Sequence, residues 1–297
     1  MSSSVLFDAP GPRARIRNHL LTAISLVAVG AVVWFIYRGF DDKGQWDGKI
    51  WAPFVDPSTW TDYIIPGLLG TLKAAAAAAV LALVFGAVFG LARLSEHRWI
   101  RMIAGFVVEV FRSIPLLLLI FFIYFLMQGG DYTFFALVLG LTLYNGSVLA
   151  EVVRAGVLAV PNGQSEAAYA IGLRKSQVMR MILLPQAVTA MMPAIVSQLV
   201  VLLKDTALGY IIAYVDLLNM GFKLIPANFF GSLIPAAIVI GIIYIGLNMA
   251  LSALATWLEK RSRRSRKTAA PPIAPPGPAL IGMGPATPGA AAIEGME

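Results

Sequence analysis

SEAAYAIGLRKSQVMRMILLP (residues 165–185) is a charged stretch between two strongly apolar runs, and it holds Glu166, Arg174, Lys175 and Arg180. The whole 297-residue chain is 58% hydrophobic and only 13% charged, with a mean hydropathy of +0.77. Soluble domains carry about 25% charged residues. We therefore predict an integral membrane protein in which residues 165–185 form an ordered loop outside the bilayer.

Six apolar stretches reach or approach the length of about 20 residues that a membrane-spanning helix needs. They are residues 20–37, 63–94, 103–127, 133–153, 187–212 and 229–258. The first has a longer apolar core than a signal peptide and no small-x-small cleavage site after it, so we expect a retained helix. The predicted fold class is an all-α membrane protein of about six transmembrane helices.

Basic residues orient these spans, because cytoplasmic loops are enriched in Lys and Arg. The N-terminal tail, the 93–101 loop, the 165–185 loop and the 260–267 run KRSRRSRK are basic. Residues 38–62 instead hold three basic residues and five aspartates, which suits the outer side. We therefore predict a multi-pass protein of the cell membrane with both termini in the cytoplasm.

The predicted organisation follows from these spans. We expect a cytoplasmic tail (1–19), a first helix (20–37), an extracytoplasmic loop (38–62), a membrane core (63–258) that contains the 161–185 loop, and a cytoplasmic tail (259–297). The last tail begins basic and continues Pro/Gly-rich, a composition that is too poor in apolar side chains to offset the entropy of ordering. We predict that it is disordered.

Several kinds of site are excluded by composition. The chain has no cysteine, hence no disulfide and no thiolate metal site, and we expect no metal to bind. His19 and His97 lie at the ends of apolar runs, where a histidine is more often interfacial than a ligand. The net charge of +7 lies beside apolar segments, as topology signals do, so we expect no nucleic-acid partner. The phosphate-binding pattern G-x-x-x-x-G-K-[ST] is absent, since GQWDGKI (44–50) has the wrong spacing and no hydroxyl.

The loop at 161–185 has the residues for two short helices with a bend between them. Residues 164–171 favour helix, and Gly172 offers a left-handed stop. Ser176 is placed to cap a second helix, which Pro185 would interrupt. Ala167, Ala168 and Ile171 would form a small apolar ridge on the first helix, with basic residues around it. The loop is therefore either a docking element for another protein or an amphipathic connection at the membrane surface.

The spacing of this loop resembles the EAA signature of permease subunits of ATP-binding-cassette importers: Glu-Ala-Ala, three residues, Gly, nine residues, Ile-x-Leu-Pro. Every fixed position of the signature is filled, by Glu166, Ala167, Ala168, Gly172, Ile182, Leu184 and Pro185. GTLKAA (70–75), EVFRSIP (109–115), NGSVLAEVVRAGVLAVPNGQSEAA (145–168), LPQAV (184–188) and LLKDTAL (202–208) resemble the branch of this family that imports polar amino acids. The N-terminal LFDAPGPRAR and the extra helix followed by WAPFVDPSTW are similar to permeases of glutamate-uptake systems.

The resemblance covers about residues 63–258, a five-helix permease core that the helix at 20–37 precedes. It departs at one position, because the family usually has Ser where this chain has Ala207, which puts any role for that hydroxyl in doubt. The resemblance implies that the loop docks into a cleft of a separate ATPase subunit and that Glu166 and nearby basic residues make polar contacts there. It also implies that ATP and Mg bind to the partner and no cofactor binds to this chain, which is then not itself an enzyme.

The implied assembly has two ATPase subunits, a second permease (a related chain or a copy of this one), and an extracytoplasmic binding protein that delivers an amino acid. Closure of the ATPases on ATP would turn the permeases from inward-open to outward-open. Coupling of this kind requires that the partner make different contacts in the two states.

Ionisable residues inside spans are costly and are candidates for function. Lys204 and Asp205 lie about 25 Å along the fifth span from its inner end at 1.5 Å per residue, toward the outer leaflet. We assign Lys204, Asp205 and Thr206 to a candidate substrate path, with the alternative that their polar groups are satisfied by neighbouring groups at a helix end. Arg112, just before Pro115 in a span that we expect to kink there, and Asn145 are further candidates for this path.

Two pairs of opposite charge are spaced to meet on one helix face, Glu109 with Arg112 and Glu151 with Arg154. The second pair lies near the inner boundary, where a structural ion pair or a contact with the ATPase is favoured over substrate binding. Gly86-x-x-x-Gly90 permits close helix packing without identifying a partner.

The favoured function is the membrane-spanning permease of an ATP-driven importer for glutamate or aspartate. Import of glutamine, arginine or histidine is the alternative within the class. A secondary transporter driven by an ion gradient would leave the Glu166–Pro185 signature unexplained, and a membrane scaffold without transport would leave Lys204 and Asp205 unexplained.

Overall fold

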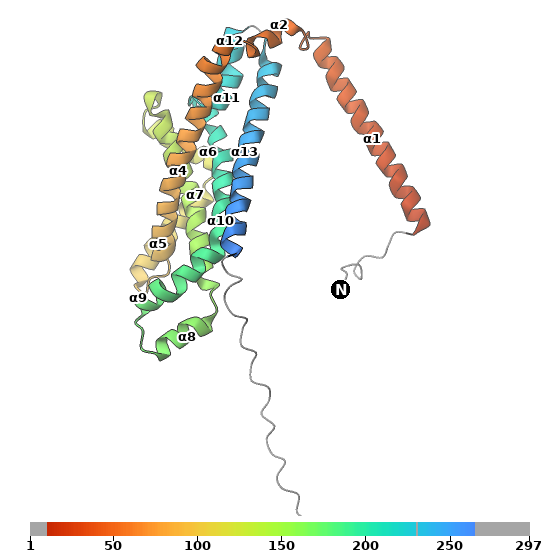
Figure 1. Cartoon of the computed structure of the whole chain (residues 1–297). Helices are drawn as coiled ribbons and strands as arrows, with labels where there is room; N and C mark the ends of the chain where they lie inside the picture. Colours follow the sequence, from red (N-terminus) through yellow and green to blue (C-terminus); the bar gives the residue numbers. More distant parts are fainter. Residues whose placement is uncertain (1–10, 230, 265–297) are drawn as a thin grey trace, which may run out of the picture.

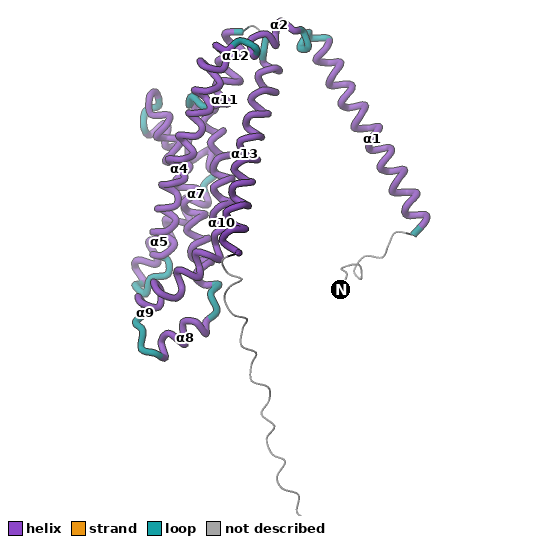
Figure 2. Tube along the Cα trace, in the orientation of Figure 1, coloured by secondary structure: helices purple, strands orange, loops and turns teal. Residues whose placement is uncertain are grey.

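The computed structural model describes residues 11–229 and 231–264, and in these ranges it contains helices, turns and no strand (Figure 2). Five helical segments are long and apolar enough to cross a membrane: Pro12–Asp41, Pro57–Ala92, Gly130–Leu158, Lys175–Ile212 and Leu233–Leu254. A bent pair, Arg98–Ser113 with Leu116–Leu126, makes a sixth if it counts as one span. The predicted all-α class with about six spans is confirmed. Residues 1–10, 230 and 265–297 lie outside the described residues, and so does the predicted tail (259–297) apart from residues 259–264, which continue the last helix, Leu233–Arg264.

The centre of the bundle is the pair α4 (Ile65–Ala92) and α7 (Thr133–Leu158). Small residues let the two backbones approach: a Cβ on Gly86 would lie 2.6 Å from the Leu149 Cβ, and one on Gly90 would lie 2.8 Å from the Ala150 carbonyl oxygen. Above them, α4 buries one alanine face, made of Ala74, Ala75, Ala78 and Ala82. The Gly-x-x-x-Gly pattern therefore serves packing within this chain, as close helix contacts in membranes require.

The other helices of the bundle pack on α7 and on one another (Figure 1). The helices α5 (Arg98–Ser113), α6 (Leu116–Leu126) and α10 (Leu184–Asp205) pack on α7, and α13 (Leu233–Arg264) packs on α10. A core of buried aliphatic side chains joins α6, α7 and α10: Leu119, Ile120, Leu137, Leu141 and Leu202. We name the two ends of the bundle by the short helices that they carry, the α8 end (α8, Asn162–Ala170) and the α12 end (α12, Ile225–Asn228).

The first helix stands apart from the bundle. Helix α1 (Pro12–Asp41) has no buried residue and slants away from the other spans, which it reaches only through the segment at the α12 end (Figure 1). That segment, expected as a loop at 38–62, contains α2 (Gly48–Trp51), η2 (Ala52–Phe54), α3 (Pro57–Thr59) and η3 (Trp60–Ile64). Trp34, Tyr37, Trp46 and Trp51 stack in series where α1 meets it. Aromatic rings of this kind favour membrane interfaces.

The third predicted span is two helices rather than one kinked helix. Helices α5 and α6 meet at an angle of 101°. Ile114 between them is extended (φ −82°, ψ 128°), as expected for a residue that precedes a proline, here Pro115. Pro115 cannot donate a backbone hydrogen bond, so the helix ends and restarts there instead of bending.

Pro185 was predicted to interrupt the second short helix of the loop, and it does not do so. Helix α9 (Lys175–Gln177), η5 (Val178–Leu183) and α10 follow one another without a loop, and together they form the span Lys175–Ile212. Three short π-helical segments each precede a helix that has a proline at its second residue. Segment η3 precedes Pro66, η5 precedes Pro185, and η7 (Met220–Leu224) precedes Pro226. A wider turn leaves room for the proline ring, which would otherwise clash with the carbonyl four residues earlier.

A turn at residues 213–216 fixes the α12 end of the bundle against α4. The Tyr214 hydroxyl donates to the Gly70 carbonyl at 3.0 Å, and the Leu217 N–H donates to the Thr71 hydroxyl at 3.1 Å. A Cβ on Gly70 would overlap the Val215 carbonyl oxygen, so only glycine allows this approach. The GTLKAA motif therefore begins with a packing position.

Asp216 follows this turn and caps α11 (Leu217–Asn219) by accepting the Asn219 N–H at 2.7 Å. It is only 1% exposed. Burial raises the pKa of this carboxyl to about 6, against the opposing effect of the hydrogen bond from Asn219.

Candidate coupling loop and transport path

Helix α8 projects from one end of the bundle (Figure 1). Its last residue is Ala170, and Gly172 provides the left-handed stop after it, as predicted. The Leu173 N–H donates to the Ala168 carbonyl at 3.1 Å and the Gly172 N–H donates to the Tyr169 carbonyl at 2.9 Å. These are the two hydrogen bonds of a Schellman motif, and Gly172 has the left-handed φ of +84° that the motif requires. The bend in the loop is therefore specified by one glycine.

The second short helix begins earlier than predicted. Its N-cap is Arg174, whose N–H donates to the Gln177 side-chain oxygen at 2.8 Å, so Ser176 lies inside α9 and does not cap it. The Gln177 side chain reaches back to the cap as in a capping box, and this fixes the helix start without a hydroxyl.

The exposed face of α8 differs from the predicted ridge. Ala168 is only 3% exposed and faces the bundle, where α8 packs against η5. Ala167 is exposed, as is Ile171 with 77% of its surface. Consecutive helical residues lie about 100° apart, so Ala167 and Ala168 cannot share a face, whereas positions i and i+4 do. Of the other signature residues, Glu166 and Pro185 are exposed, and Ile182 and Leu184 are half-buried.

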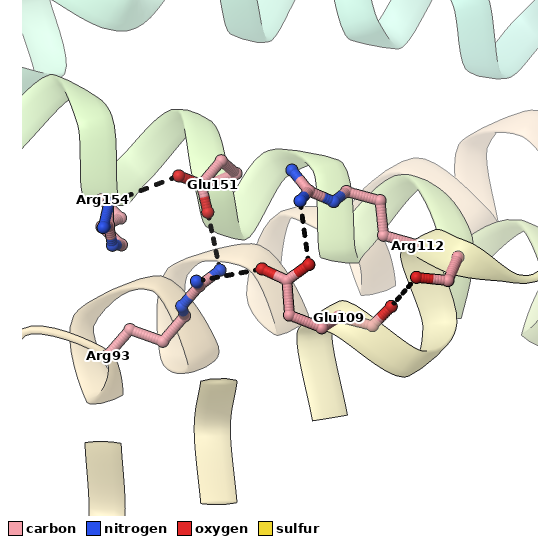
Figure 3. Close-up of polar contacts among 6 residues, drawn as sticks. Arg93, Glu109, Arg112, Glu151 and Arg154 are labelled. Carbon is pink, nitrogen blue, oxygen red and sulfur yellow. Dashed lines mark hydrogen bonds and ion pairs between the residues drawn. The ribbon is translucent and has the colours of Figure 1, made fainter. Parts of the chain in front are cut away.

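A network of five charged side chains lies at the α8 end, where α4, α5 and α7 meet (Figure 3). Glu109 accepts from Arg112 at 2.9 Å, and Glu151 accepts from Arg154 at 3.4 Å, so both predicted pairs form. Arg93 lies between them and donates to Glu109 at 3.2 Å and to Glu151 at 2.6 Å. Three helices are thus joined through one guanidinium group.

A further ion pair joins the loop to this region. The Lys175 ammonium lies 2.8 Å from the Glu96 carboxylate, in the turn between α4 and α5. The hydrogen bond from Lys175 holds the pKa of Glu96 below its usual value. The contacts of Arg93 and Glu96 were not predicted. The basic residues at 93–101 served only to orient the spans, and the partners of Arg93 and Glu96 lie far away in the sequence.

A second polar cluster lies between α7 and α10. Asn145 is fully buried, accepts from the Gln198 amide at 2.7 Å and donates to Asp205 at 3.5 Å. Gln198 was not predicted here, although a glutamine inside an apolar helix was a signal for it. Asn145 is the thirteenth of the 26 residues of α7, so Asp205 lies beside the middle of that helix. The helical segment that contains Asp205 begins at Lys175, twelve residues before the predicted start at Ala187.

The other predicted path residues are distributed differently. Lys204 is exposed, while Thr206 is fully buried and donates its hydroxyl to the Leu203 carbonyl at 2.6 Å. Arg112 belongs to the charge network and is not joined to the Asn145 cluster. Both clusters include a residue of α7. Glu151 lies six positions after Asn145, which is about 9 Å along the helix axis. Within the described residues there is no group of three or more His, Asp or Glu side chains that could hold a metal.

The part of the chain that contains both clusters matches a known protein family. Residues 82–264 match the family described as the inner membrane component of binding-protein-dependent transport systems. The chain belongs to this family. The predicted resemblance to permease subunits of ATP-binding-cassette importers is therefore confirmed, and the chain is a membrane permease subunit rather than an enzyme.

The relatives are permeases of the amino-acid branch. The glutamate transport system permease GluD of Corynebacterium glutamicum is 44% identical over 230 residues, which cover 75% of this chain and 84% of that one. The arginine transport system permease ArtQ of Bacillus subtilis is 32% identical over 203 residues, which cover 67% and 92%. A crystal structure of an amino acid ABC transporter with histidines superposes with a TM-score of 0.61 at 29% identity, over 68% of this chain and 95% of that one. The chain is therefore an amino-acid ABC transporter permease.

Proposed function

We propose that this permease imports glutamate or aspartate, driven by ATP hydrolysis on separate ATPase subunits that grip the α8–Gly172–α9 loop. In this proposal two ATPases, each with ATP and Mg, act on two permeases, and an extracytoplasmic binding protein delivers the amino acid. The α8 end faces the cytoplasm, which places both termini there as well. The 44% identity to a glutamate permease supports the substrate class.

The bent loop is the observation that carries the coupling role. A Schellman motif holds α8 at a fixed angle to the helix that starts at Lys175, and that helix continues into α10 without a loop. A force on α8 therefore has a stiff path into a membrane span. The exposed Ala167 and Ile171 offer an apolar contact, and the adjacent Glu166 offers a polar one. Small and apolar groups at the centre with charge at the rim are typical of protein interfaces.

The polar cluster at mid-membrane supports a substrate path. Asn145 and Gln198 orient Asp205 between α7 and α10, and the exposed Lys204 is the neighbouring cation. We propose that Lys204 pairs with a carboxylate of the substrate while Asn145 and Asp205 contact its polar groups. Thr206, which is buried on its own helix, would support the path without touching substrate.

Import of a basic amino acid is the second candidate. Asp205 could pair with the cationic side chain of such a substrate, just as Lys204 could pair with the carboxylate of an anionic one. An arginine permease is among the relatives. The two candidates differ in which of these residues the substrate contacts.

The test uses the permease purified with its co-isolated ATPase subunits and reconstituted in liposomes with the binding protein. We expect glutamate or aspartate to stimulate ATP hydrolysis and to accumulate in the liposomes, and arginine, histidine and glutamine not to do so. The chain has no cysteine, so Lys175→Cys and Gly163→Cys each place a single cysteine in the loop. Crosslinking from either cysteine would report contact between the loop and the ATPase. Stimulation by arginine alone would favour the second candidate, and uptake that needs no ATP would overturn the coupling role.

A further inference from the structure

We infer that Arg93 is a positioning residue that connects the coupling loop to α5, so that movement of the loop moves α5 during transport. This inference rests on the proposed function. Arg93 bonds to carboxylates from two other helices at once, Glu109 on α5 at 3.2 Å and Glu151 on α7 at 2.6 Å (Figure 3). Its side chain is only 13% exposed, whereas those of Glu109 and Glu151 are 48% and 32% exposed, so Arg93 is the buried centre of a network whose carboxylates reach water.

A short segment joins Arg93 to the coupling loop. Lys175, the first residue of α9, pairs with Glu96 at 2.8 Å. Glu96 lies three residues after Arg93, and backbone hydrogen bonds from Leu94 to Leu91 (3.0 Å) and from Ser95 to Ala92 (3.1 Å) close the turn between them. The Lys175 and Glu96 side chains are 48% and 68% exposed, so this pair is a surface contact that places the coupling loop three residues from Arg93 along the chain.

Helix α5 is the element that has freedom to respond. Glu109 and Arg112, its two charged contacts, occupy its last turn, directly before the break at Ile114. A cavity of about 680 Å³ opens between the first half of α5, at Arg101 and Gly105, and the end of α7, at Arg154 and Leu158. The face of α5 at Arg101 and Gly105 is thus not filled against the end of α7, although Ala104 beside it is buried, and this leaves α5 room to swing about the break while α6 stays in the core.

Arg93 decides whether α5 follows the loop. With Arg93 present, Glu109 and Glu151 share one cation, and α5 is held to α4 and α7. Without it, Glu109 keeps its pair with Arg112 and Glu151 keeps its pair with Arg154, but no cation joins α5 to α4 and α7. We expect such a protein to bind the ATPase and to allow ATP hydrolysis, since α8 and Gly172 are unchanged, while the movement no longer reaches α5. Hydrolysis would then be uncoupled from transport.

The experiment measures ATP hydrolysed per amino acid imported, in liposomes with the whole assembly. Arg93→Gln should raise this ratio about tenfold, because Glu109 on α5 then has no ion pair with the segment that Lys175 contacts, and the coupling between loop and α5 is lost. Arg101→Gln is the matched control, since Arg101 lines the same cavity and donates only to the Ser95 carbonyl. It should keep the ratio of the parent. Spin labels on the exposed Met102 and Leu158 should report an ATP-dependent change in distance in the parent and none in Arg93→Gln.

A triple variant, Arg93→Gln with Glu109→Gln and Glu151→Gln, separates coupling from folding. It removes both carboxylates that Arg93 joins, and Arg112 and Arg154 are 40% and 35% exposed and stay accessible to water, so it should insert and assemble like the parent even if Arg93→Gln alone does not. We expect its ratio to stay high, because the connection between loop and α5 is still missing. A ratio equal to that of the parent in this variant would overturn the inference. Absence of ATP-driven uptake by the parent assembly would instead overturn the proposed function.

Discussion

Replacement of Gly172 by alanine tests the bend in the coupling loop without disturbing any packing contact. Gly172 has φ +84°, and nothing lies within 4 Å of a Cβ built on it. The penalty of the substitution is therefore that of the backbone alone, roughly 1–2 kcal/mol for an L-residue in the left-handed region. This corresponds to a population of the bent loop that is lower by about 5- to 30-fold.

The apparent affinity for the ATPase should fall by up to the same factor, because only the bent loop binds. Titration of the purified ATPase subunit against each permease variant in detergent measures it. Gly172→Asn should lose less than Gly172→Ala, since asparagine visits the left-handed region more readily. Gly163→Ala is the control: Gly163 lies in α8, has no positive φ and has equal space around it, so the variant should bind like the parent.

The reasoning is refuted if Gly172→Ala binds the ATPase as tightly as the parent, or if Gly172→Asn is no better than Gly172→Ala. A loss of membrane insertion in these variants, with Gly163→Ala unaffected, would also contradict it, because an exposed turn that touches nothing should not be needed for insertion.

Three further outcomes are expected. Lys204→Met should raise the KM for glutamate about tenfold or more, as loss of a charged hydrogen bond does, with ATPase binding unchanged; equal transport would remove Lys204 from the path. Stability should fall as pH rises from about 4 through the Asp216 pKa of about 6, by about 3 kcal/mol, because the folded protein holds this proton more tightly; thermal unfolding of Asp216→Asn should lack the slope. Gly70→Ala should cost about 1–3 kcal/mol of stability through overlap with Val215, whereas Gly105→Ala, with open space around it, should cost little.

The sequence was informative wherever a local rule determines the structure. Long apolar runs located the spans, since length and hydropathy alone decide whether a helix can cross a bilayer. Gly172 was predicted as the stop of α8 because the left-handed conformation selects glycine. The pairs Glu109–Arg112 and Glu151–Arg154 followed from helical spacing, and the structure forms both.

Contacts between distant segments could not be predicted in this way. Arg93 lies 58 residues from Glu151, and no periodicity connects them. Pro185 was expected to break the helix, but a π-turn before it accommodates the ring, and nothing in local propensity distinguishes that outcome from a break. Ala168 was placed on the wrong face of α8 because two adjacent alanines leave the buried side of a short helix undetermined.

The distribution of burial indicates which helices are fixed and which move. In α7, 61% of the apolar window is buried, against 22% in the span that contains α10. Helix α7 also carries Asn145 of the mid-membrane cluster and Glu151 of the charge network, about 9 Å apart. A densely packed helix is the stable reference in a bundle, and segments held by a few polar contacts open first. We therefore expect α7 to be the reference, with a displacement of the coupling loop reaching α10 through the continuous helix from Lys175, and α5 through the ion pairs of Lys175 with Glu96 and of Arg93 with Glu109.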